Sequence, residues 1–419
     1  MNDTKQSHGG TERDSFWSLM FASLSYRDFR LVWTGSFTEH LGEFMEMGAI
    51  LWLVNELTHS PLILTIVGAS RFISMIFLPL VGGVVADRMD RRTLLIIALV
   101  AAGVLSAALA VLTGTGHIAV WHLIVISLLI GAATSFNHPA RQAIVPNLVE
   151  RRHLLNAVSL DMISVLASRM VGMALVGSLM TVIGVWPIFL LRIAGCIVAI
   201  LLLLNAKIPA TPTDTSRPAP WQSLVQGFKY LKGNTIILIL SVLFLLPWLA
   251  DNSYTSFAPV FATDILHINA TGYGFFQAAP GLGALIALVT LAMLTHYRNK
   301  SALFIGSGII MGLALIAFAL STGIPVSLVM VVIFGAMQMG FVSINTALIQ
   351  GAIPDEVRGR VMSIREVTFG LGPAGAIIFG AIAEYTGAPV SVSLLGGFCF
   401  LVALLPLFAY RRLRKLEIH

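Results

Sequence analysis

Long apolar runs recur along this chain, and they limit its fold more than any other feature. About 20 apolar residues reach about 30 Å as an α-helix, the thickness of a bilayer's hydrocarbon core. We identify twelve runs: 31–55, 61–86, 93–113, 119–140, 155–180, 185–205, 234–256, 271–295, 301–321, 325–350, 361–385 and 389–410. The stretch from Leu94 to Leu112 is continuously apolar, whereas barrel strands alternate. The sequence therefore predicts an all-α membrane protein with twelve transmembrane helices.

Charge distribution predicts the orientation. All of the 26 Lys and Arg residues except Arg71, Arg169 and Arg192 lie in the first 30 residues, the C-terminal tail or every second connection. The other six connections contain none. Basic residues stay on the cytoplasmic side, so both termini are expected in the cytoplasm of a bacterial inner membrane. The net charge of +6 then indicates anionic lipid headgroups as partners rather than nucleic acid.

A polar, Pro-rich stretch between the sixth and seventh runs divides the chain. We expect a cytoplasmic segment (1–30), a six-helix bundle (31–206), a cytoplasmic linker with an interfacial helix (207–233), a second six-helix bundle (234–410) and a cytoplasmic tail (411–419). The interfacial helix is expected from Trp221 to Asn234. Weak matches at an offset of 208, such as Arg152 with Arg360, predict two pseudo-symmetric bundles with a substrate site between them.

The connection after the second run reads Gly-Val-Val-Ala-Asp-Arg-Met-Asp-Arg-Arg, residues 83–92. It resembles the signature loop of the major facilitator superfamily, with Asp90 where many members have Gly. Together with Phe29-Arg30, Pro139-Ala140-Arg141-Gln142 and Arg358-Gly359-Arg360, this substitution is similar to the enterobactin-exporter branch. The resemblance implies a single-chain, alternating-access transporter that is driven by protons and has no cofactor.

The resemblance also assigns a cytoplasmic gate, although these arginines could instead only set topology. The gate residues are Gly83, Asp87, Arg88, Arg91, Arg92, Arg141, Arg358, Arg360 and Arg365. Many exporters of the superfamily carry a Gly-Pro pair in the fifth span, but here Gly172 precedes Met173, which weakens a drug-antiporter reading. Gly370-x-Gly372-x-x-Gly375 lies in an apolar run without a preceding strand, so we interpret it as helix packing rather than dinucleotide binding.

Three carboxylates share one face of the first run. Glu39, Glu43 and Glu46 are spaced i, i+4, i+7, and an intramembrane carboxylate costs a few kcal/mol, so this stripe is expected to face a cavity. Glu43 and Glu46 are then the preferred proton carriers, with fixed ion pairs to arginines as the alternative. Asp251 is either a further proton site or a solvated interfacial carboxylate.

A metal site made from these carboxylates and His40 is not expected. His40 lies about 100° off the stripe, and the helical rise spreads the carboxylates over about 10 Å.

Arg71 and Arg169 lie about as deep as Glu46, which permits pairing. Guanidinium groups suit anions, so these two residues predict a carboxylate-bearing or catecholate substrate. Arg192, in the sixth run, is interpreted as a structural ion pair or a snorkelling side chain. Further substrate-binding candidates are Trp248, Asn252, Tyr254, Gln277, Gln338 and Asn345.

These features favour a proton-coupled exporter of a small amphipathic or anionic organic molecule, with a siderophore-like substrate preferred. Multidrug efflux or lysolipid transport is the alternative. The sequence contains no nucleotide-binding motif or catalytic constellation, so we do not expect an enzyme. A sensor would be expected to carry an additional soluble domain.

Overall fold

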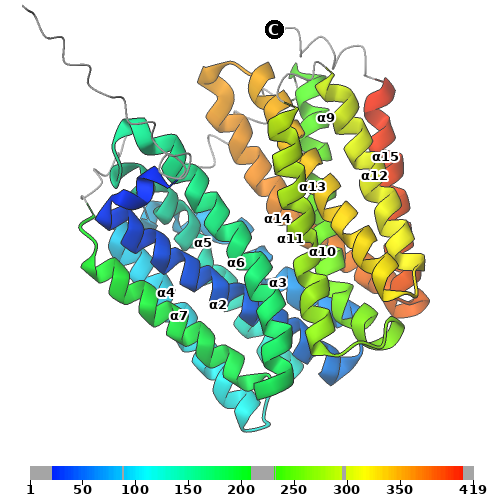
Figure 1. Ribbon diagram of the computed structural model, residues 1–419, viewed down its shortest axis with the longest axis horizontal. Helices are drawn as coiled ribbons and strands as arrows, with labels where there is room; N and C mark the ends of the chain where they lie inside the picture. Colours follow the sequence, from blue (N-terminus) through cyan, green and yellow to red (C-terminus); the bar gives the residue numbers. More distant parts are fainter. Residues whose placement is uncertain (1–20, 87–88, 209–230, 232, 295–298, 409–419) are drawn as a thin grey trace, which may run out of the picture.

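The computed structural model describes residues 21–86, 89–208, 231, 233–294 and 299–408, and within these ranges the regular structure is helical (Figure 1). The helices of the first half are η1 (Ala22–Ser25), α2 (Arg27–Thr58), α3 (Pro61–Ala86), α4 (Arg91–Gly114), α5 (Val120–Ile144), η2 (Val145–Asn147), η3 (Arg151–His153), α6 (Leu154–Ile183) and α7 (Trp186–Asn205). Those of the second half are α9 (Thr235–Leu243), α10 (Leu245–Val260), η4 (Phe261–Ile265), α11 (Ala270–Met293), α12 (Lys300–Leu320), α13 (Ile324–Ala352), α14 (Asp355–Thr386) and α15 (Ala388–Phe408).

Each predicted apolar run coincides with one of these helices, and α9, α10 and η4 together form the seventh. Within the described residues, nine segments are long and apolar enough to cross a membrane. For α2, α3 and α14, which have 32, 26 and 32 residues, the crossing stays a prediction. Most of the predicted interfacial helix lies outside the described residues.

The helices form two bundles with matching contacts (Figure 1). In the first bundle α3 packs on α5 and α4 on α7, and in the second α11 packs on α13 and α12 on α15. Between the bundles, α3 meets α14 and α6 meets α11. His59 and His267, which are 208 residues apart, both follow a helix end with a φ of 49°. The fold therefore has the pseudo-symmetry that the sequence offset predicted.

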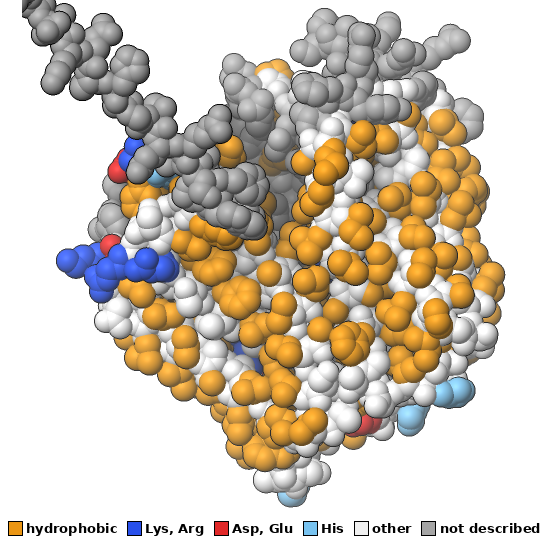
Figure 2. All heavy atoms as spheres, viewed as in Figure 1, with side chains coloured by type: hydrophobic (Ala, Val, Ile, Leu, Met, Phe, Trp, Pro, Cys, Tyr) orange, Lys and Arg blue, Asp and Glu red, His pale blue; other side chains and the backbone are white. Residues whose placement is uncertain are grey.

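Large apolar side chains are spread over the face of both bundles that Figure 2 shows. Val104 on α4, Leu201 on α7 and Leu401 on α15 are 64%, 54% and 63% exposed. Apolar surface of this extent would be unstable in water, so lipid is its natural solvent. The chain is a multi-pass membrane protein.

The two ends of the bundles differ in charge. We call the end where α2, α4 and α6 begin the basic end, and the opposite end the distal end. The basic end carries Arg27, Arg30, Arg91, Arg92, Arg151, Arg152, Lys207 and Lys300. The distal end carries the connections at His59, Gly116, Gly184, His267, Gly323 and Gly387.

Asp90 begins α4. Its Oδ2 accepts hydrogen bonds from the Thr93 amide at 3.1 Å and the Thr93 hydroxyl at 3.2 Å. An aspartate N-cap satisfies a helix-terminal amide that would otherwise lack a partner. This contact explains why aspartate suits the position where the signature loop often has glycine.

Asp90→Ala is expected to destabilise the protein by about 1 kcal/mol, because the cap is lost. Asp90→Asn should keep wild-type stability, because asparagine caps equally well. Thermal unfolding of both variants in detergent tests this expectation. Equal unfolding temperatures for Ala, Asn and wild type would contradict it.

Candidate functional site

Polar contacts join the two bundles at the distal end. Glu384 on α14 accepts a hydrogen bond from the Ser60 hydroxyl at 2.7 Å and from the Leu62 amide at 3.2 Å. The Asn55 side chain donates to the Thr263 hydroxyl at 3.1 Å. Ser60 and Leu62 lie at the N-terminus of α3, in the first bundle. Glu384 therefore links this helix end to α14 of the second bundle. The distal end is closed in this structure.

Glycines allow the bundles to touch there through backbone. A β-carbon added to Gly274 on α11 would lie 2.8 Å from the Met173 carbonyl oxygen and 2.9 Å from the Gly177 Cα on α6. Tyr273 adds a hydrogen bond of 3.1 Å from its hydroxyl to the Gly48 carbonyl oxygen on α2. Close approach of this kind needs small residues on both helices.

One ion pair spans the bundles. Arg169 on α6 places Nη2 2.9 Å from both carboxylate oxygens of Asp251 on α10. The Asp251 side chain is 8% exposed and that of Arg169 is 27% exposed. The interpretation of Asp251 as a solvated interfacial carboxylate is wrong, because the residue is buried and paired with Arg169.

A small cavity lies between the bundles. Its volume is about 20 Å³, enough for about one water molecule. Its polar lining residues are Arg71, Ser127, Asn252, Thr255 and Ser256. The cavity thus takes residues from both bundles, and it includes two of the predicted substrate-binding residues, Arg71 and Asn252.

Arg71 pairs with Glu43 at this cavity. The guanidinium Nη2 on α3 donates to Glu43 Oε1 on α2, and the two side chains are 8% and 19% exposed. The similar depth of Arg71 and Glu46 permitted a pair between them, but the pair that forms at Arg71 is with Glu43, the carboxylate that points toward α3.

Glu39 and Glu46 do not face the space between the bundles. Arg192 on α7 donates from Nη2 to Glu39 Oε1 at 2.9 Å, and its Nε lies 3.7 Å from Glu46 Oε2. Ser106 on α4 donates to Glu46 Oε1. Neither Glu39 nor Glu46 lines the cavity between the bundles, so the prediction that the whole stripe faces it is wrong for these two residues. Arg192 and Glu46 are 0% exposed, so snorkelling is wrong for Arg192. The fixed ion pair with Arg192 fits this geometry.

His40 joins the carboxylates to α5. Its Nδ1 lies 2.6 Å from the Ser36 carbonyl oxygen and its Nε2 lies 2.8 Å from Arg141 Nη1. Arginine only donates hydrogen bonds, so Nε2 accepts here and Nδ1 carries the proton. Arg141 also lies 3.5 Å from Asp161 on α6.

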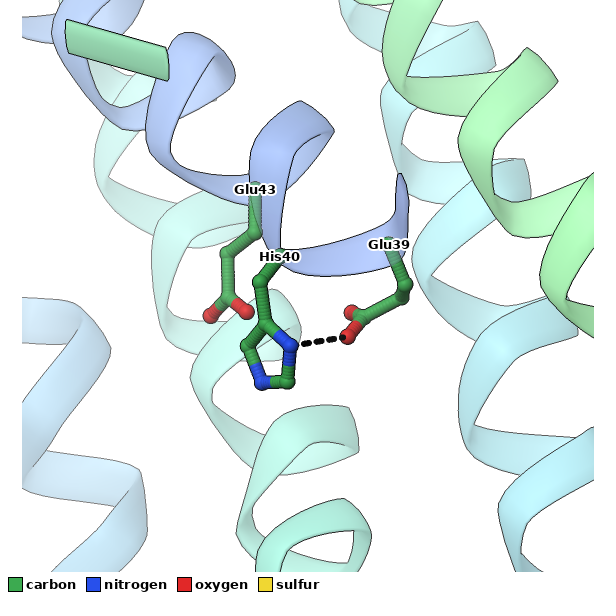
Figure 3. Close-up of side chains that lie close together, drawn as sticks. All are labelled: Glu39, His40 and Glu43. Carbon is green, nitrogen blue, oxygen red and sulfur yellow. Dashed lines mark ion pairs between the residues drawn. The ribbon is translucent and has the colours of Figure 1, made fainter. Parts of the chain in front are cut away.

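Glu39, His40 and Glu43 converge on one point from the same side of α2 (Figure 3). Ligand atoms of the three lie within 4.8 Å of one another, closer than the sequence analysis expected. Arg192, Arg141 and Arg71 already bond to these groups. A cation would have to displace three guanidinium groups, so the arrangement suits proton transfer better than metal binding.

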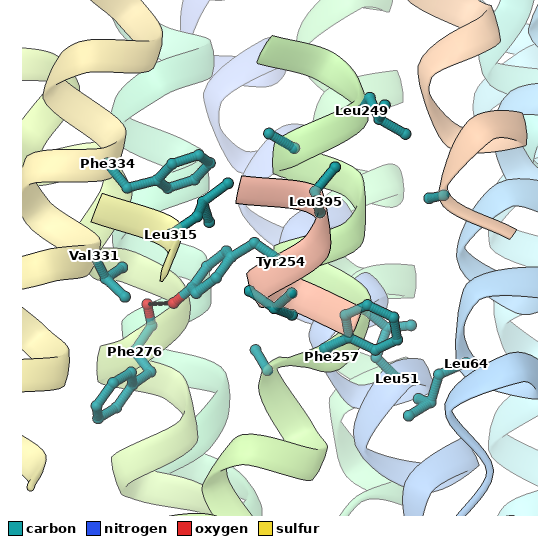
Figure 4. Packing of buried hydrophobic residues seen from close by; sticks show 14 of the residues in the cluster. Leu51, Leu64, Leu249, Tyr254, Phe257, Phe276, Leu315, Val331, Phe334 and Leu395 are labelled. Atoms are coloured by element: carbon teal, nitrogen blue, oxygen red, sulfur yellow. Dashed lines mark hydrogen bonds between the residues drawn. The ribbon is translucent and has the colours of Figure 1, made fainter. Parts of the chain in front are cut away.

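Several candidates of the second half belong to the interior of their own bundle. The Tyr254 hydroxyl donates to the Phe276 carbonyl oxygen at 2.6 Å, among Phe334 and other buried side chains (Figure 4). Gln338 donates to the Pro247 carbonyl and Asn345 to the Leu240 carbonyl, each at 2.9 Å. These contacts contradict a cavity position for Tyr254, Gln338 and Asn345.

The other polar candidates lie near the bundle interface. Gln277 bonds to the Thr255 carbonyl at 3.0 Å and to the Tyr273 hydroxyl at 3.2 Å, so it supports the tyrosine that reaches α2. Asn252 donates to the Trp248 carbonyl at 2.8 Å. Trp248 packs against Gly372, which agrees with a packing role for that glycine motif.

The gate candidates are only partly described. Asp87 and Arg88 lie outside the described residues, as do the side chains of Arg358, Arg360 and Arg365, and Gly83 is described only as part of helix α3. Arg92 donates to the Leu204 carbonyl on α7 at 2.6 Å. Arg141 is 2% exposed and contacts α2 and α6. Both contacts stay inside the first bundle, so Arg141 and Arg92 brace that bundle.

Three important residues escaped sequence reasoning. Glu384 is a single carboxylate near a helix end, Ser106 a lone hydroxyl in an apolar run, and Asp161 a carboxylate within a predicted span. Only Asp161 carried a signal, because an intramembrane carboxylate needs a partner.

Known proteins share this architecture. A POT family transporter in complex with 5-aminolevulinic acid has a TM-score of 0.75 at 14% identity, covering 92% of this chain and 96% of that chain. The staphyloferrin A transporter of Staphylococcus aureus is 26% identical over 388 residues, 92% of this chain and 97% of that protein. The enterobactin exporter EntS of Shigella boydii serotype 18 is 27% identical over 383 residues, 86% and 87% of the two chains.

The profile of one family covers residues 18–419, and its description is transmembrane secretion effector. The match to this family agrees with two features of the structure. These are the two helical bundles with matching contacts and the ion pairs inside apolar helices. The chain therefore belongs to the transmembrane secretion effectors of the major facilitator superfamily, and it is a transporter rather than an enzyme.

Proposed function

We propose that this protein is a proton-coupled exporter of a small anionic or amphipathic organic molecule, with a siderophore-like substrate. The observation that carries the proposal is the pair of arginines at the bundle interface, Arg71 at the cavity and Arg169 bridged to Asp251. The names of the staphyloferrin A transporter and the enterobactin exporter support the substrate class. The protein acts as a single chain by alternating access.

The basic end is the cytoplasmic end of a bacterial inner membrane, with both termini inside. The closed distal end then faces outward. The substrate enters when the bundles separate at the basic end, and it then reaches Arg71. An inside-negative membrane potential favours the export of an anion. Its contribution to the driving force is about 2.3 kcal/mol per negative charge and 100 mV.

The Arg169–Asp251 pair provides the proton step. Opening the distal end separates α6 from α10, and Asp251, left without its counter-charge, takes a proton from outside. Closing the distal end brings Arg169 back to Asp251, and the carboxyl group releases that proton toward the cytoplasm. One substrate molecule leaves and one proton enters in each such cycle.

At the cavity, the substrate competes with Glu43 for Arg71. An anionic group that binds Arg71 displaces Glu43 from its hydrogen bond. A guanidinium group offers bidentate recognition of a carboxylate, which a neutral amide cannot replace.

Arg71→Gln is expected to lower export of staphyloferrin A or enterobactin at least tenfold, because the anion loses its counter-charge. Export is measured in proteoliposomes under a proton gradient. Arg152→Gln is the matched control, because Arg152 is 71% exposed and pairs with Glu150 at the surface. Wild-type protein that exports neither compound but exports a cationic drug or a lysolipid would overturn the proposed substrate.

A further inference from the structure

A second cavity lies inside the first bundle, away from the bundle interface. Its volume is about 30 Å³, room for about two water molecules. Its polar lining residues are Ser36, Glu39, Asn137 and Arg141. We call it the inner cavity.

The inner cavity extends toward the basic end. Val32 lies in the second turn of α2, Leu95 in the second turn of α4 and Leu203 in the last turn of α7, and all three line it. It therefore spans from Glu39 to about one turn from the basic end.

Arg141 brings N–H groups without hydrogen-bond partners to this cavity. The residue is 2% exposed, and its Nε and Nη2 have no hydrogen-bond partner among the described residues. A buried guanidinium with free N–H groups strongly favours water or another acceptor beside it. Water is therefore favoured at the part of the inner cavity lined by Ser36, Glu39, Asn137 and Arg141, whereas its remaining walls are apolar.

Glu39 and His40 connect the inner cavity to the bundle interface. Glu39 uses Oε1 for Arg192, whereas its Oε2 lies 3.7 Å from His40 Nδ1. Glu43, on the other side of the imidazole, belongs to the Arg71 pair (Figure 3). The three proton-binding groups thus lie within 4.8 Å of one another, with the inner cavity beside Glu39 and the substrate site beside Glu43.

We infer that Glu43, His40 and Glu39 form a proton relay from the substrate site through the inner cavity to the basic end. This inference rests on the proposed proton-coupled function and gives the proton its own exit. A route separate from the space between the bundles lets the proton leave while the substrate occupies Arg71.

The step moves one proton and no electrons. Glu43, displaced from Arg71 by the substrate, takes up the proton that Asp251 releases and gives it to His40 Nε2. Nδ1 of the same ring then gives its proton to Glu39 Oε2, which lies 3.7 Å away. Glu39 passes it to water in the inner cavity. The ring, left with its proton on Nε2, regains its first tautomer when water takes the Nε2 proton and gives one to Nδ1. Arg141 must move from Nε2 toward Asp161, which lies 3.5 Å from its Nε.

Charged groups of both signs surround His40. The cations are Arg71, Arg141 and Arg192, and the carboxylates are Glu39, Glu43 and Asp161. An imidazole has one nitrogen that donates and one that accepts, so it can pass a proton from one neighbour to another.

The test compares proton movement with substrate exchange. Purified full-length protein in proteoliposomes receives staphyloferrin A as the probe, and an internal pH dye reports protons. Exchange of labelled staphyloferrin A at equal pH on both sides needs no net proton transfer. His40→Gln keeps a donor for Ser36 and an acceptor for Arg141 but cannot relay a proton.

In His40→Gln the proton flux is expected to fall at least about tenfold, while exchange stays within about twofold of wild type. His153→Gln is the matched control, because His153 bonds to Tyr26 at 2.9 Å away from the relay, and it should keep both activities. Equal proton flux in His40→Gln and wild type would overturn the relay alone. Wild-type protein that moves no protons with the probe would overturn the proposed function as well.

A second variant decides the matter if His40→Gln does not fold. Asn137→Leu has similar size but removes a polar wall of the inner cavity, so the proton flux should fall while exchange continues. Asn205→Leu, at the exposed end of α7, is its control. An undiminished proton flux in Asn137→Leu would overturn the route through the inner cavity.

Discussion

Arg192→Met should destabilise the folded protein by about 3–5 kcal/mol, because the substitution leaves buried carboxylates without their counter-charge. Arg192 is 0% exposed, and its guanidinium serves Glu39 at 2.9 Å and Glu46 at 3.7 Å. Thermal unfolding in detergent, followed by size-exclusion chromatography, measures the loss. Little monodisperse protein is expected at 37 °C.

The same environment predicts a rescue. Combining Arg192→Met with Glu39→Gln and Glu46→Gln removes the uncompensated charges, and most of the stability should return. Arg152→Met, at an exposed ion pair, should change little. Wild-type stability of the single Arg192→Met variant would show that this ion pair contributes nothing.

Asp251→Asn is expected to open the distal end, because Arg169 loses the only charged partner found for it among the described residues. Spin labels at positions 117 and 267 report the opening, since both residues are exposed distal histidines in different bundles. The ratio of closed to open molecules should fall at least tenfold, which corresponds to about 1.4 kcal/mol. Proton-coupled export should be lost with it.

A charge exchange separates pairing from simple loss of a side chain. Arg169→Asp alone should abolish export, because two carboxylates then face each other. Arg169→Asp combined with Asp251→Arg restores opposite charges, so distal closure and part of the export should return. If the double variant stays as open as either single variant, the pair does not hold the bundles together.

The positions of the helices could be predicted from sequence because the thickness of a bilayer sets the length of an apolar run. The match between bundles was visible in the offset of 208, which also separates Asn55 from its partner Thr263. Which side of a helix meets which neighbour was harder to predict. Hydropathy hardly changes around these helices, so it carries little information on their rotation.

The carboxylate stripe shows this limit. Glu39, Glu43 and Glu46 share one face of α2, yet α2 lies between α7 and α3, so Glu39 and Glu46 meet Arg192 while Glu43 meets Arg71. Gly35 and Gly42 could have indicated which face of α2 packs on α7. A β-carbon on Gly42 would lie 3.1 Å from the Arg192 Cα, so small residues mark where α7 approaches.

The second bundle shows the same difficulty. Asn252 and Tyr254 are two residues apart in the sequence. Tyr254 forms its hydrogen bond inside the core of the second bundle, whereas Asn252 lines the cavity between the bundles. Composition cannot distinguish the two positions, because both helix faces carry polar atoms. The direction of each side chain depends on the packing of α10 against α11 and α14.

Gly177 and Gly274 leave α6 and α11 in backbone contact, so a rotamer change of a side chain cannot open a path for the substrate at that point. Release then requires two whole helices to move apart as rigid bodies, on a timescale of about microseconds to milliseconds. The transport rate should therefore depend more on the viscosity and lateral pressure of the surrounding lipid than on the size of the substrate.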